Sequence, residues 1–118
     1  MEWEVEIGEQ VADWLLTAPK GTFEQVMAAI DVLKEDGPGL GRPLVDSVKK
    51  SRHSNMKELR PGSEGKSEVR ILFAFDKIRQ AILLIAGDKS GDWNKWYDKN
   101  IPIADDLFDV HQRSLKKK

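Results

Sequence analysis

The fold is decided by residues 55–89, which read NMKELRPGSEGKSEVRILFAFDKIRQAILLIAGDK. Three runs in this stretch suit β-strands, at 55–60, 68–75 and 81–89, because apolar and β-branched residues dominate the second and third and alternate with polar ones in the first. The connections between them, 61–66 and 76–79, carry the Pro, Gly, Ser and Asp residues typical of turns. The stretch therefore predicts a meander of three antiparallel strands.

Cations stand inside these strands or at their ends, at Lys57, Arg60, Arg70 and Lys89. Fixing a long charged side chain on a rigid strand is costly unless the charge binds an anion. The segment is thus interpreted as a phosphate-handling surface built on a sheet, and RNA is the first partner to consider.

The composition fits one domain spanning residues 1–118, since 40% of the residues are hydrophobic and four Trp and four Phe can fill a single core. No cysteine is present, so disulfides, thiolate zinc sites and cysteine nucleophiles are excluded. The lack of cysteine also favours a cytoplasmic setting. The acidic, alternating start is unlike a signal peptide, and no apolar run approaches the length of a membrane span.

The net charge of −1 conceals two halves of opposite sign. Residues 1–36 hold nine acidic residues and two lysines, whereas residues 37–118 hold seventeen basic and eleven acidic residues. Such a division suits a protein that turns one face towards nucleic acid, but an acidic helical face can equally be a solvated surface. Both interpretations stay open at this point.

The segments around the meander complete an α+β pattern. Alternation at the N-terminus predicts a strand. Apolar residues at helical spacing then predict two helices, the first ending before Pro19 and the second before Gly37-Pro38. The order is β-α-α-β-β-β-α, which predicts an antiparallel sheet with the helices packed on one face. The flanking elements are expected at residues 3–7 (strand), 11–18 and 22–36 (helices), 37–54 (a connection without a clear period), 93–97 (a short helix or turn, broken by Pro102) and from 103 onward (the last helix).

Three motifs make the chain resemble the RelE/HigB-type toxins of bacterial toxin–antitoxin modules, in the branch of phage-derived Gp49-like proteins. They are Glu58-Leu59-Arg60, Val69-Arg70-Ile71-Leu72-Phe73 and Gly87-Asp88-Lys89. The resemblance covers nearly the whole chain. It implies a small ribonuclease that cleaves mRNA, usually on the translating ribosome, and is held inactive by a cognate antitoxin.

The chemistry implied by the resemblance needs neither metal nor cofactor, because the ribose 2′-hydroxyl attacks the adjacent phosphate and the protein supplies geometry and charge. By the two-residue period of a strand, Glu58, Arg60 and Arg70 could converge on one cleft. The resemblance adds Lys89 and Tyr97, and His53 beside the basic run could donate a proton. The expected catalytic residues are Arg70, Glu58, Lys89, Tyr97 and His53, and the expected RNA-binding residues are Arg60, Lys57, Arg52, Lys95 and Trp96.

Other interpretations remain for several of these features. Arg70 could form a plain cross-strand ion pair with Glu58 or Glu68, and Trp93 or Trp96 could be largely core. Met56 and Glu58 occupy positions where the most active RelE-like enzymes carry lysines, and the pI of about 6.1 is low for such toxins. The fold also supports ParE-like toxins that bind a topoisomerase, and a degenerate antitoxin-binding module is a third alternative.

Overall fold

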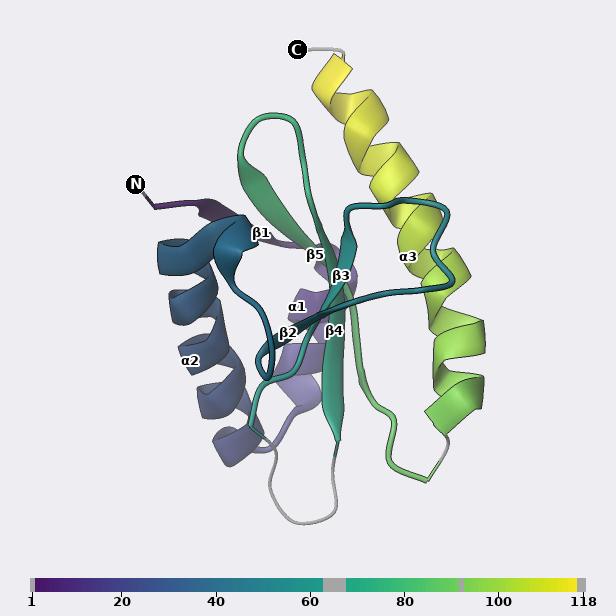
Figure 1. Ribbon diagram of the computed structural model, residues 1–118. Helices are drawn as coiled ribbons and strands as arrows, with labels where there is room; N and C mark the ends of the chain where they lie inside the picture. The colour runs from purple at the N-terminus through teal and green to yellow at the C-terminus, as the bar shows by residue number, and fades with distance from the viewer. Residues whose placement is uncertain (1, 63–67, 92, 117–118) are drawn as a thin grey trace.

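The strands form a mixed sheet in the order β1-β5-β4-β3-β2 in a computed structural model that describes residues 2–62, 68–91 and 93–116 (Figure 1). The helices flank this sheet. The elements are β1 (Glu4–Ile7), α1 (Glu9–Thr17), α2 (Lys20–Asp36), the 3₁₀ turn η1 (Gly37–Gly39), β2 (Val45–Ser47), β3 (Met56–Leu59), β4 (Val69–Phe75), β5 (Gln80–Asp88) and α3 (Trp93–Lys116).

The predicted meander is confirmed, because β3 pairs antiparallel with β4 and β4 with β5. The sheet is not wholly antiparallel, since β1 lies beside β5 in the parallel direction. Gly8 ends β1 where its backbone N–H donates to the carbonyl of Leu83 at 2.9 Å. A β-carbon at Gly8 would lie 2.4 Å from that carbonyl oxygen, so the close approach needs glycine.

The connection 37–54 contains a strand that its sequence did not indicate. Val45 pairs with Leu59 and Ser47 with Lys57, which adds β2 to the far edge of the sheet. Three residues are too few to show a period, and the strand exists because Val45 is buried and β3 offers a free edge. The element order is therefore the predicted one with a short strand inserted before the meander.

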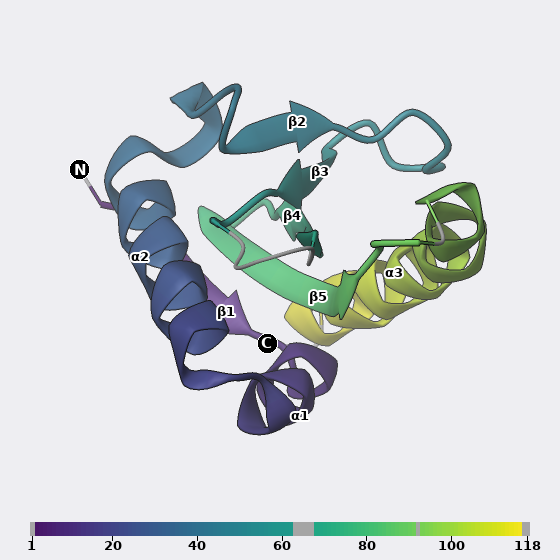
Figure 2. The same ribbon diagram turned by 90° about the horizontal axis from the view of Figure 1, so that it is seen from below.

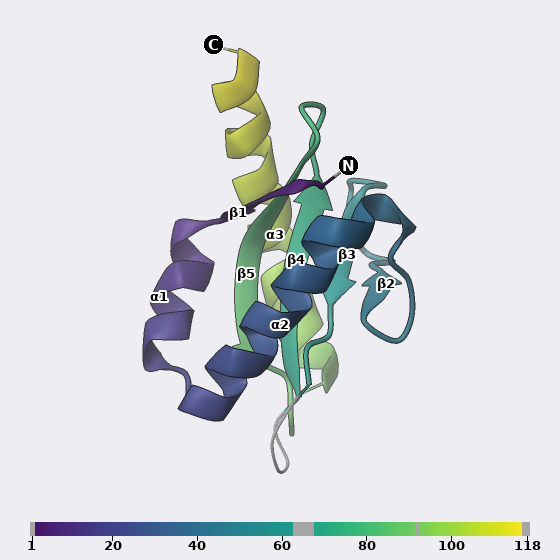
Figure 3. The same ribbon diagram turned by 90° about the vertical axis from the view of Figure 1, so that its left-hand side faces the viewer.

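The helices cover both faces of the sheet, so the expectation that they pack on one face is wrong. Helices α1 and α2 lie on one side, and α3 lies on the other (Figure 2, Figure 3). The reason is visible in β4, where Ile71 and Phe73 pack with α1 and α2 while Leu72 and Ala74 pack with α3. A strand with apolar residues of both parities is buried on both faces.

The last helix runs without interruption through Pro102, which was expected to break it. Proline inside a helix removes one backbone hydrogen bond and costs roughly 3 kcal/mol. The helix survives because Ile101, Ala104 and Phe108, at helical spacing, are all buried against the sheet. None of the helices in the described part of the chain has the length and apolarity to cross a membrane.

Candidate functional site

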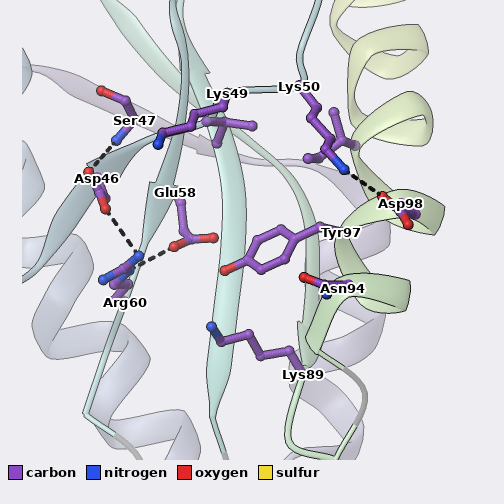
Figure 4. Close-up of a pocket in the computed structure, with 12 residues that line it drawn as sticks. Asp46, Ser47, Lys49, Lys50, Glu58, Arg60, Lys89, Asn94, Tyr97 and Asp98 are labelled. Carbon is purple, nitrogen blue, oxygen red and sulfur yellow. Dashed lines mark hydrogen bonds and ion pairs between the residues drawn. The ribbon is translucent and has the colours of Figure 1, made fainter.

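A pocket of about 300 Å³ opens where β2, β3, the end of β5 and the first turns of α3 meet. Figure 4 shows the side chains of Glu58, Arg60, Lys89 and Tyr97 directed towards one another in it. Its lining residues are Asp46, Ser47, Val48, Lys49, Lys50, Glu58, Arg60, Lys89, Asn94, Tyr97, Asp98 and Ile101.

Glu58 stands at the centre of the pocket's charged groups. Its side chain is 4% exposed, and its Oε1 atom lies 2.7 Å from Arg60 Nε and 3.7 Å from Arg70 Nε. Arg60 also reaches Asp46, with Nη2 3.1 Å from Oδ2. Burial acts to lower the pKa of Arg60, but the hydrogen bond and charge of Glu58, together with Asp46, raise it above its usual value. Arg60 is therefore a permanent cation.

Arg70 comes from the neighbouring strand, β4, and lies next to Glu58. Its Nη1 atom donates to the carbonyl of Val69 at 2.8 Å, and its side chain is 13% exposed. Its Nε atom is buried without a hydrogen-bond partner, although Glu58 Oε1 is near enough to form an ion pair. The convergence of Glu58, Arg60 and Arg70, predicted from strand alternation, is thus present in the structure.

Lys89 enters the pocket directly after β5. It is buried, and its Nζ atom lies 5.2 Å from the centre of the Tyr97 ring, within the range of a cation–π contact. Burial lowers the pKa of Lys89, the charge of Arg70 lowers it further, and Glu58 partly opposes the change. Lys89 therefore gives up a proton more readily than a solvated lysine does.

Tyr97 faces these groups from the first turns of α3. Its ring is half-buried, and its hydroxyl points towards Glu58 (Figure 4). Burial, followed by the hydrogen bond and negative charge of Glu58, raises the pKa of Tyr97 to about 12, with Arg70 opposing. Tyr97 consequently stays protonated at neutral pH and serves as a hydrogen-bond donor.

The arrangement places two cations, Arg60 and Lys89, with one carboxylate and one phenol in the lining of a single pocket, and a third cation, Arg70, next to Glu58. The cations can neutralise the charge of a bound phosphate, Glu58 can accept a proton, and Tyr97 can donate a hydrogen bond. Within the described residues, no group of three His, Asp or Glu side chains lies close enough together to hold a metal ion. The chemistry available to these residues is anion binding combined with proton transfer.

Arg52 and His53, two of the predicted site residues, lie outside this pocket. Arg52 forms ion pairs with Asp106 and Asp109 of α3, and the His53 Nε2 atom lies 2.8 Å from Asp109 Oδ1. The ring of His53 also packs edge-on against Phe108. The acidic face of α3 binds both basic residues. The sequence did not predict these contacts, because no sequence pattern links positions more than fifty residues apart.

Of the other predicted RNA-binding residues, only Arg60 lines the pocket. Lys57 points to the opposite face of β3 and borders a second pocket beside Phe75, and Lys95 is exposed on α3 but does not line the pocket. Trp96 packs against the core, with its Nε1 atom next to Gly87, as the core interpretation predicted. The side chain of Trp93 lies outside the described part of the structure.

Eight of the twelve pocket residues were not predicted. The run Lys49-Lys50 was visible in the sequence as a basic segment, but its place at the pocket depends on the path of the chain between β2 and β3. Asp46 lies on the strand that the sequence did not indicate. The unpredicted lining residues with polar side chains are Asp46, Ser47, Lys49, Lys50, Asn94 and Asp98.

Comparison with solved structures shows similarity to RelE proteins. The toxin RelE of E. coli, in a mutant form in the free state, matches with a TM-score of 0.63 at 10% identity, over 86% of this chain and 97% of that one. The RelE–RelB complex of Pyrococcus horikoshii matches with a TM-score of 0.56 at 20% identity, over 77% of this chain and 99% of that chain. At these identities the likeness shows the fold.

Sequence comparison gives closer relatives and a family. The protein of Mycobacterium tuberculosis named "Putative toxin HigB2" is 58% identical over 109 residues, which are 92% of this chain and 54% of HigB2, so the chain spans about half the length of that relative. "Putative toxin HigB3" of the same organism is 54% identical over 96 residues, 81% of this chain and 82% of HigB3. The model of the phage-derived Gp49-like proteins matches residues 13–109. The chain therefore belongs to the phage-derived Gp49-like family and is a RelE/HigB-like protein.

Proposed function

We propose that this chain is the toxin of a toxin–antitoxin module and acts as a metal-independent endoribonuclease on mRNA, at the ribosome, with a cognate antitoxin as its inhibitor. The observation that carries the proposal is the convergence of Arg60 and Lys89 with Glu58 and Tyr97 in one pocket, with Arg70 Nε 3.7 Å from Glu58 Oε1. The toxin names of its relatives and the RelE–RelB complexes among its structural neighbours support the same biological role.

The first chemical step is attack of a ribose 2′-hydroxyl on the adjacent phosphorus. A phosphodiester entering the pocket competes with Glu58 for the guanidinium groups of Arg60 and Arg70, which releases the carboxylate to take the 2′-hydroxyl proton. The two arginines then stabilise the extra negative charge on the phosphorane-like transition state. Each of these roles depends on cations that are in place before the substrate arrives.

The second step is departure of the 5′-oxygen as the P–O5′ bond breaks. Lys89 is suited to protonate that oxygen, because burial and Arg70 lower its pKa and so make it a stronger acid than a solvated lysine. Tyr97, which stays protonated, donates a hydrogen bond within the same site. The products are a 2′,3′-cyclic phosphate and a 5′-hydroxyl.

Expression of the chain alone in a bacterial host should arrest growth and protein synthesis, and co-expression of the adjacent antitoxin gene should restore both. The reason is that an uninhibited ribonuclease removes mRNA from translation. Growth curves together with primer-extension mapping of mRNA ends measure the effect. Unimpaired growth would contradict the toxin proposal, whereas arrest with intact mRNA would instead favour the ParE-like, topoisomerase-binding alternative.

Cleavage by the purified chain should be unaffected by EDTA. Arg60, Arg70 and Lys89 supply the positive charge that metal ions supply in two-metal nucleases, and the described residues offer no metal-binding group. Incubation of free RNA with excess EDTA tests this expectation, and mass spectrometry of the fragments identifies their ends. Inhibition by EDTA, or fragments bearing 5′-phosphates, would overturn the proposed mechanism.

A further inference from the structure

The chain between β2 and β3 forms a strap, defined here as residues 48–53, that crosses to α3 and returns (Figure 1). Its first half borders the pocket, where Val48, Lys49 and Lys50 contribute to the lining. Figure 4 shows Lys49 and Lys50 along the side of the pocket opposite Lys89. The strap therefore adds two ammonium groups that the mechanism above does not use.

Asp105 on α3 fastens the second half of the strap. Its Oδ1 atom accepts a hydrogen bond from the Ser51 hydroxyl, and its Oδ2 atom accepts one from the Arg52 backbone N–H at 3.1 Å. The Ser51 hydroxyl oxygen in turn accepts the backbone N–H of His53 at 3.0 Å. One carboxylate thus fixes the backbone over three consecutive residues.

Asp105 differs in its surroundings from the other anchors of the strap. Its side chain is 5% exposed, whereas that of Asp106 is 77% exposed and the Lys50–Asp98 pair is 73% and 59% exposed. Exposed ion pairs contribute little, while hydrogen bonds to a buried carboxylate are among the stronger ones in proteins. Asp105 does not line the pocket, so its role towards any substrate is indirect.

We propose that Asp105 is a positioning residue that fixes the strap beside the pocket, and that Lys49 and Lys50 thereby form a second phosphate subsite for single-stranded RNA, next to the one formed by Arg60, Arg70 and Lys89. The inference rests on the proposed RNA substrate. In this inference the strap binds the phosphate next to the scissile phosphate along the RNA chain.

The test combines Asp105→Asn with the double replacement Lys49→Ala/Lys50→Ala. Asparagine keeps the shape of the side chain, but its amide nitrogen cannot accept a hydrogen bond. Either the Ser51 hydroxyl or the Arg52 N–H therefore loses its acceptor. Amide hydrogen exchange in the strap should then become about tenfold to a hundredfold faster, as loss of a charge-assisted bond predicts. Asp106→Asn, one residue away and exposed, is the matched control and should change the exchange little.

Binding is measured with a 2′-O-methyl single-stranded RNA of about ten nucleotides, which lacks the attacking hydroxyl, so cleavage plays no part. The double lysine replacement should weaken binding and reduce the dependence of log K on log salt by about one unit. Asp105→Asn should weaken binding to a similar extent. In the Asp105→Asn background the lysine replacement should have little further effect, because the misplaced lysines no longer contribute.

Additive effects of the two changes would overturn the inference, since they would show that Asp105 stabilises the fold without acting through the lysines. Faster strap exchange with unchanged RNA affinity would overturn it as well. If Asp105→Asn does not fold, as judged by circular dichroism, Ser51→Ala is used in its place, because it removes the other partner of the Ser51–Asp105 hydrogen bond. Binding that behaves as expected in a chain that cleaves no RNA would support the inference and refute only the catalytic part of the proposed function.

Discussion

Replacement of Arg70 by alanine is expected to reduce RNA cleavage by about a hundredfold to a thousandfold, the usual consequence of removing one donor that stabilises transition-state charge. The fold should change little, because Glu58 keeps its 2.7 Å bond to Arg60 when Arg70 is lost. Initial rates of cleavage, with the melting temperature measured alongside, separate these two effects.

Two further variants sharpen the Arg70 experiment. Arg70→Lys keeps the charge but loses the planar fork, so it should recover only part of the activity. Arg113→Ala removes an exposed arginine in the last turn of α3, far along the helix from Tyr97, and should leave cleavage unchanged. Parental activity in Arg70→Ala would exclude Arg70 from the site, and an unfolded Arg70→Ala protein would make it a structural residue.

Replacement of Glu58 by glutamine should lower cleavage by about a hundredfold to ten-thousandfold, the range expected for removal of a general base. RNA binding should persist, because Arg60, Arg70 and Lys89 keep their positive charges. Initial rates of cleavage and RNA affinity, measured side by side, check the two expectations.

Asp46→Asn is the matched control for Glu58→Gln. Asp46 is the second carboxylate bound to Arg60, at 3.1 Å, so its replacement disturbs the position of Arg60 without removing the proposed base. A modest loss of activity is expected. Equal losses in the two variants would show instead that Glu58 acts by holding the arginines.

The strand period predicted that Glu58 and Arg60 share one side of their strand and that Arg70 could converge with them. In an extended chain successive side chains point to opposite faces, so parity fixes the side of a residue within its own strand. The pairing of β3 with β4, with Glu58 opposite Leu72, places Arg70 on the same side. The expectation that all helices lie on one face fails because β4 carries apolar residues of both parities, so both of its faces are buried.

The sequence by itself determined the family, the meander and the common side of Glu58 and Arg60, because each depends on residue order along the chain. Only the tertiary structure decided which other groups join them. Tyr97 reaches the site because Ile101, Ala104 and Phe108 dock α3 on the sheet across Pro102, and this docking depends on the burial of a whole helix face, which no short period in the chain records. Asp105 and Asp109 bind Arg52 and His53 outside the pocket, through contacts between residues more than fifty positions apart.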